Sequence, residues 1–162
     1  MNNTPLLFAM TEYESGCVER VNHFLKVYAF AKAIGEGEAF PAKTQEILET
    51  AAIVHDIGIK PSLEKYGSAA GEYQELEGPA AAKEMLDRLG YPADMTDRVC
   101  YLVGHHHTYS CIVGDDYQAL VEADFLVNIF EGDMKRPEIE AVRKNIFATE
   151  TGKKLLDTLF LK

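Results

Sequence analysis

The chain has 162 residues, of which 47% are hydrophobic, enough to form the core of one domain. Its formal net charge of −10, without a long basic run, argues against a protein dedicated to duplex nucleic acid. No stretch reaches the roughly 18 consecutive apolar residues of a membrane span. A small phosphorylated substrate remains compatible with this charge, because a bound metal ion can supply positive charge locally.

The cysteines and the first residues bear on the compartment. Cys17, Cys100 and Cys111 lack close or C-x-x-C spacing, and an odd number at irregular spacing predicts reduced thiols. The first residues lack the basic segment of a signal peptide. We therefore expect a cytoplasmic protein that does not enter the membrane.

Apolar residues recur at helical spacing along most of the chain, and strand-like alternation is nearly absent. We predict an all-α fold, with residues 1–162 as a single domain, a core over 17–131 and C-terminal helices within 137–161. The pattern of apolar residues, glycines and prolines predicts helices over 5–14, 17–34, 41–55, 78–89, 92–107 and 115–130, then one or two more within 137–161.

Glycine and proline predict where these helices end. Residues 35–38, with two glycines, are expected to end the second helix, and Gly58 and Pro61 the third. Residues 60–74 are predicted to form a long loop of the kind that often acts as a lid. A second loop is expected over 108–114.

Four polar side chains lie on otherwise apolar helical segments. His55 and Asp56 follow the run Ala-Ala-Ile-Val, just before a glycine, while His23 and Asp124 are single polar residues on two other apolar stretches. Burying imidazoles and carboxylates is costly unless something binds them. Two histidines and two aspartates suit a divalent metal ion, and they leave open coordination positions for water and a phosphate oxygen.

Each of these residues also has a structural interpretation. His23 could be a core histidine bonded to a carbonyl, and Asp124 a buried carboxylate with a backbone or charged partner. Asp56 could cap the turn that follows it. The four residues together favour the metal site.

The order His … His-Asp … Asp resembles the HD superfamily of metal-dependent phosphohydrolases. The resemblance covers roughly residues 17–131 and maps the metal ligands onto His23, His55, Asp56 and Asp124. It implies a helical bundle around a divalent ion (Fe, Mn, Co, Ni, Zn or Mg), with Asp56 also catalytic. The implied reaction is hydrolysis of a small phosphate ester, with nucleotides as one candidate class. The subfamily resembles small bacterial HD proteins, so no particular substrate is implied.

His105, His106 and His107 form a second cluster. Successive residues of a helix point about 100° apart, so all three cannot face one site. His105 and His106 resemble additional histidines of the family and are assigned catalytic roles, whereas His107 is expected to be exposed. The alternative is that all three are solvent-facing residues at a helix end, where the helix dipole favours them.

One departure from the family bears on the number of ions. Dinuclear HD members usually carry another histidine shortly before the helix predicted from Gly78, where this chain has Gln74, Glu75 and Glu77. One ion is therefore favoured over two. Glu75 and Glu77 could bind a second ion or the substrate, act as acid or base, or form a solvated helix start.

Two cationic residues are candidates for binding the substrate phosphate. Lys60 follows the His-Asp pair closely, and Arg20 lies one helical turn before His23. Lys60 could instead be solvated, and Arg20 could form a salt bridge with Glu14 or with a metal-binding carboxylate.

The competing functions are an HD-type di-iron oxygenase and a non-catalytic HD module that binds a metal or a ligand. The oxygenase requires a full second metal site, against which the missing histidine counts. The expected partner is a small phosphorylated molecule, and a homo-oligomer is an open alternative.

Overall fold

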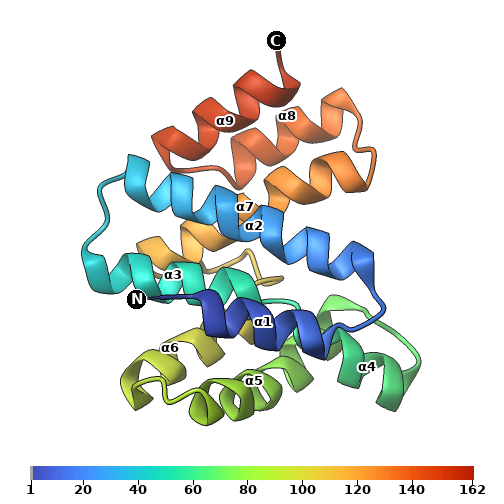
Figure 1. Cartoon of the computed structure of the whole chain (residues 1–162). Coiled ribbons are helices and arrows are strands. Elements are labelled where there is room, and N and C mark those ends of the chain that lie inside the picture. The colour runs from blue at the N-terminus through green and yellow to red at the C-terminus, as the bar shows by residue number, and fades with distance from the viewer. Residues whose placement is uncertain (1) are drawn as a thin grey trace.

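The structure is a computed structural model that describes residues 2–162, and within that range it contains nine α-helices and no strand. The predicted all-α fold is confirmed. Figure 1 shows the helices in chain order. They are α1 (Thr4–Tyr13), α2 (Val18–Gly37), α3 (Ala42–Val54), α4 (Ile59–Tyr66), α5 (Gly71–Arg88), α6 (Ala93–Val103), α7 (Asp115–Glu131), α8 (Arg136–Asn145) and α9 (Glu150–Phe160).

Helices α2, α3 and α7 form the centre of the molecule, where each packs against the other two. They supply much of the buried apolar core, including Phe24, Leu48, Ile53 and Leu120. Full burial of each such side chain contributes roughly 1.5–3 kcal/mol to folding. Polar groups placed among these three helices are therefore held in a rigid apolar surrounding.

The remaining helices cover this centre from three sides. Helix α1 packs on α3, while α5 packs between α4 and α6, and α6 contacts α3. Helices α8 and α9 lie together at the opposite end of the view from α5 and α6, and α9 contacts α2 and α7 (Figure 1). No helix among residues 2–162 is long and apolar enough to cross a membrane.

Helix α2 ends at Gly37, inside the stretch 35–38 that was expected to end it and three residues beyond the predicted bound of 34. A Cβ at Gly35 would lie 2.0 Å from Gln45 Oε1, and one at Gly37 would lie 2.5 Å from Thr151 Oγ1. These glycines allow α3 and α9 to approach α2 closely.

The long loop predicted over 60–74 is also wrong, because α4 and the start of α5 occupy most of it. Pro61 lies in the first turn of α4, where its missing N–H has no intrahelical acceptor to bond. Gly67, with φ of 65°, ends α4 in the left-handed conformation. Helix α5 begins at Gly71 and contains Pro79, so the stretch before Gly78 is helical.

The later boundaries agree better with the predictions. The loop over 108–114 is confirmed, and two helices follow α7, with Thr149 capping the second through its side chain. Helix α6 ends at Val103, however, and residues 104–107 form a turn. The histidine cluster therefore lies in a turn, where the predicted helical spacing does not apply.

Candidate metal centre

The four predicted ligands meet at one point from three different segments. His23 comes from the middle of α2, His55 and Asp56 from the turn that follows α3, and Asp124 from α7. The Nε2 atom of His23 lies 3.2 Å from His55 Nε2, 3.1 Å from Asp124 Oδ1 and 3.3 Å from Asp56 Oδ2. Two ligands at ~2.1 Å from one tetrahedral ion lie roughly 3.4 Å apart, so these separations suit a shared cation.

The histidines present the correct nitrogen to this point. His55 Nδ1 lies 2.8 Å from the carbonyl of Ala52, and His23 Nδ1 lies 2.9 Å from Glu131 Oε2. A carbonyl oxygen can only accept, so His55 Nδ1 donates and the neutral ring keeps its lone pair on Nε2. Such second hydrogen bonds fix the tautomer and orientation of metal-binding histidines. A cation bound at this point would take the place of the Nε2 protons through which His23 and His55 otherwise hydrogen-bond to Asp124.

Glu131 was missed by the sequence analysis. It lies seven residues after Asp124, two helical turns along α7, so the two side chains share one face of that helix. Lys26 Nζ donates to the other oxygen of Glu131 at 2.7 Å. The i, i+7 spacing of these two acids along the helix was the available signal.

The charges of the cluster support a cation site. Burial alone would raise the pKa of Asp124, but hydrogen bonds from His23 and His55 hold it well below the usual range. Burial would likewise raise the pKa of Asp56, but the charges of His55 and His106 lower it. For His55, burial would lower the pKa, and Asp56 raises it instead. Both carboxylates are therefore ionised at neutral pH, as a cation site requires.

A second group of candidate ligands shares Asp56. Donor atoms of Asp56, His106 and His107 lie within 4.8 Å of one another, as do those of His23, His55 and Asp56. His106 donates through Nδ1 to the carbonyl of Val103 at 2.8 Å, and its Nε2 lies 3.4 Å from Asp56 Oδ1. That buried Nε2 has no hydrogen-bond partner among residues 2–162, which is how an unsatisfied metal ligand would look.

The structure reverses the predicted roles of His105 and His107. His105 Nδ1 donates to the carbonyl of Tyr101, and its ring stacks on that tyrosine with centroids 4.1 Å apart. His107 instead faces the centre, and its Nε2 lies 3.2 Å from Gln74 Oε1. Burial, and then His106, lower the pKa of His107 to about 4, so the ring is neutral. The prediction failed because these residues form a turn rather than a helix.

Glu75 holds this turn and does not line the cleft over the centre. Its carboxylate accepts hydrogen bonds from the backbone N–H of His107 at 2.9 Å and from Thr108 Oγ1 at 3.0 Å. Gly71 lets α5 approach, since a Cβ there would lie 3.0 Å from His107 Cγ. Glu75 was predicted to contact the substrate or a second ion. It has a positioning role instead, because helix α5 directs its side chain at the turn.

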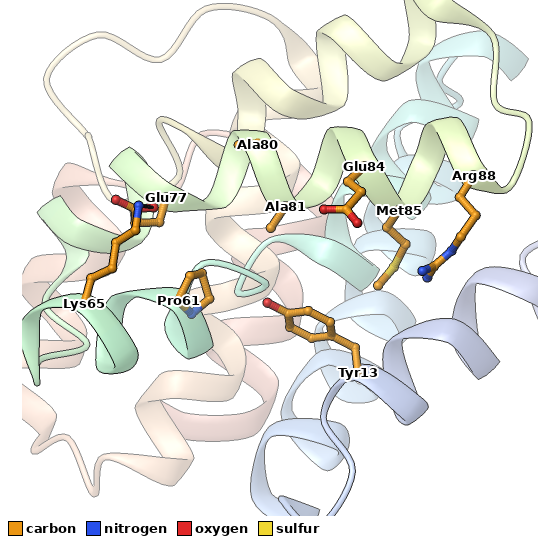
Figure 2. Close-up of a pocket in the computed structure, with 9 residues that line it drawn as sticks. All are labelled: Tyr13, Pro61, Lys65, Glu77, Ala80, Ala81, Glu84, Met85 and Arg88. Atoms are coloured by element: carbon orange, nitrogen blue, oxygen red, sulfur yellow. Dashed lines mark hydrogen bonds and ion pairs between the residues drawn. The ribbon is translucent and has the colours of Figure 1, made fainter.

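Glu77 and Lys60 lie outside the centre, contrary to their predicted substrate contacts. Glu77 accepts from Lys65 at 2.6 Å and from the hydroxyl of Tyr66 at 2.8 Å. Glu77 and Lys65 line a surface groove of about 340 Å³ between α1, α4 and α5. Figure 2 shows both residues at one end of this groove. Lys60 donates to the carbonyl of Tyr13 at 3.2 Å and lies over its ring. Lys60 points away because residues 59–66 are helical, and Glu77 lies on α5, where it faces Lys65 and Tyr66 of α4.

A cleft of about 290 Å³ opens over the ligands. Arg20 lines it and also donates through Nε to Glu14 Oε2 at 2.6 Å, the salt bridge expected as its alternative, while its contact with a substrate phosphate stays a prediction. The sequence analysis assigned no role there to Glu19 or Asn128, and it treated Gln74 only as the residue that replaces a histidine. The cleft is lined by His23, Asp56, Asp124 and His107 together with Glu19, Arg20, Gln74, Asn128 and Glu131.

The comparisons with known proteins agree with this geometry. A crystal structure of a predicted HD superfamily hydrolase from an uncultured Thermotogales bacterium superposes with a TM-score of 0.70 and 21% identity, covering 99% of this chain and 92% of that one. This likeness shows a shared fold. No curated protein matches the chain. The HD domain family matches residues 20–123, which span His23, His55 and Asp56 and end one residue before Asp124. The chain therefore belongs to the HD domain family.

Proposed function

We propose that the protein is a metal-dependent phosphohydrolase that acts on a small phosphate ester. The observation that carries the proposal is the convergence of His23, His55, Asp56 and Asp124 on one point beneath a cleft that also contains Arg20. Nitrogen and carboxylate donors of this kind suit Fe, Mn, Co, Ni, Zn or Mg. When bound, a divalent ion polarises a phosphoryl oxygen and lowers the pKa of a coordinated water.

The chain's own residues would bind and orient the ester. Arg20 uses Nε on Glu14, which leaves its terminal nitrogens as donors for a phosphate oxygen. Glu131 holds the ring of His23, and the carbonyl of Ala52 holds that of His55. His106 is 1% exposed, so it acts through Asp56 or through a second cation and does not touch the substrate. This position argues against the direct catalytic role expected for His106.

We propose one tightly held ion, in the group of His23, His55 and Asp56, beside which Asp124 Oδ1 lies 3.1 Å from His23 Nε2 and 3.5 Å from His55 Nε2. The second group shares its only carboxylate with the first, and it adds two histidines, with Gln74 beside His107. A site with fewer anionic donors holds a divalent ion more weakly. A second ion would therefore bind with lower affinity.

The sharing of Asp56 between two donor groups makes a di-iron oxygenase the second candidate. The two functions differ in what they consume. An oxygenase would contain two irons per chain and take up oxygen, whereas a phosphohydrolase releases phosphate without oxygen.

A screen of the metal-loaded protein against phosphate esters tests the proposal. We expect phosphate release that is lost on removing the metal and in the variant Asp124→Asn. Undiminished release from the metal-free protein would contradict the proposal, as would oxygen uptake by a two-iron form without phosphate release.

A further inference from the structure

The cleft contains little free positive charge. Arg20 is the single lysine or arginine that lines it among the described residues, and its Nε is bonded to Glu14, whose side chain is 2% exposed. Lys26 lies beside the cleft, paired at 2.7 Å with Glu131, which lines it. One divalent ion would balance Asp56 and Asp124. The cations near the cleft are thus each matched by a carboxylate.

Glu19 is not matched in this way. It is exposed, it lines the cleft, and no lysine or arginine pairs with it in the part of the chain that the structure describes. Its one hydrogen-bond contact is a weak one, from Cys17 Sγ at 3.8 Å. Asn128, the neutral neighbour of Glu131 along the cleft, adds an amide. The opening therefore presents a carboxylate and an amide that both accept hydrogen bonds from hydroxyls, and the carboxylate also repels anions.

The size of the cleft also favours a small substrate. Its volume of about 290 Å³ is at the small end of ligand pockets, which hold roughly 300–1,000 Å³. One phosphoryl group at the ion and Arg20 would leave room for a single small leaving group. That leaving group would lie beside Glu19 and Asn128.

We propose that the cleft selects phosphate monoesters of neutral, hydroxyl-bearing alcohols, such as sugar or nucleoside monophosphates, and that Glu19 rejects substrates with a second anionic group. This inference rests on the proposed function. In the reaction a water oxygen forms the new bond to phosphorus while the bond to the alcohol oxygen breaks. The alcohol leaves with a proton that the water supplied, so no oxidant or reductant is needed.

The test compares two esters that differ by one phosphate group, a nucleoside 5′-monophosphate and the corresponding nucleoside 3′,5′-bisphosphate, in which a second anionic group replaces the 3′-hydroxyl. With metal-loaded protein at low ionic strength, we expect kcat/KM for release of the 5′-phosphate to be roughly tenfold higher for the monophosphate. The ratio should shrink in Glu19→Gln and as salt rises, because salt screens exposed charges. Glu64→Gln, an equal charge change on exposed α4, is the control and should keep the wild-type ratio.

Equal kcat/KM for the two esters, or a Glu19→Gln ratio identical to that of Glu64→Gln, would overturn the inference while leaving the proposed function standing. Calorimetry of the same two ligands binding to the metal-loaded protein tests charge selection independently of hydrolysis. If neither ester releases phosphate but the monophosphate binds more tightly and Glu19→Gln narrows the difference, the charge selection stands and the hydrolase proposal fails. Binding of neither ligand would overturn the inference.

Discussion

The two donor groups that share Asp56 are built very differently. The first draws on α2, the end of α3 and α7, the three helices that pack together at the centre of the fold. The second draws its histidines from a turn, residues 104–107, that depends on polar contacts from Glu75 and Gln74 of α5. The first is thus fixed by apolar packing, and the second by a few hydrogen bonds.

This difference teaches that one centre can combine a rigid half and an adjustable half. Close-packed helices tolerate little displacement, so the first group is already arranged for a cation. The turn can be loosened by removing one carboxylate at a distance from the ion. Substitutions in the two halves should therefore have separable effects on metal content and on stability.

The largest effect should come from Asp56, the residue common to both groups. Asp56→Ala should abolish metal binding and phosphate release while the helical circular dichroism stays near that of the wild type. The carboxylate contributes charge to the ion and no apolar burial to the core. Asp97→Ala, at an exposed position on α6, is the control. Full phosphate release by the Asp56 variant would contradict the assignment of Asp56 as a metal ligand in both donor groups.

Glu131 tests the rigid half through a residue that does not bind the ion. Glu131→Gln removes the charged partner of His23 Nδ1, and we expect metal affinity to fall roughly 10–100-fold, measured by titration with the metal. Glu64→Gln should leave the affinity unchanged. Equal affinities in the two variants would show that the bond to His23 has no influence on the ion.

His106 tests the adjustable half. His106→Ala should retain one ion per chain and lower phosphate release roughly 10–100-fold, because Asp56 loses its neighbour on the Oδ1 side. Metal analysis and kinetics on the same sample give both numbers. A drop from two ions to one would instead show that the second group is fully occupied in the unmodified protein.

Glu75 and Glu77 form a matched pair on α5 with the smallest expected effects. Glu75→Ala leaves the backbone N–H of His107 without its acceptor, which should lower the free energy of unfolding by about 1–3 kcal/mol, or several degrees in Tm. Glu77→Ala removes only exposed partners and should leave Tm unchanged. Both variants should keep one ion. Equal Tm values would remove the positioning role assigned to Glu75.

The rigid half of the centre was predictable from the sequence, and the adjustable half was not. His23, His55, Asp56 and Asp124 interrupt apolar helical stretches, so local periodicity was enough to identify them. His107 depends on how residues 104–107 leave α6, which helical spacing cannot describe. The long loop predicted over 60–74 failed because Pro61 lies in the first turn of α4 and Gly71 begins α5, and this error hid the contact of Gln74 with His107.

Metal content at equilibrium is the most direct test of the central claim, that His23, His55, Asp56 and Asp124 hold the ion on which hydrolysis depends. The purified protein, loaded with Mn, Fe or Zn and dialysed, should retain one ion per chain. The variant Asp124→Asn should retain well under one, with its helical fold intact. Full retention of the ion by Asp124→Asn, or no retained ion in the unmodified protein, would contradict the account.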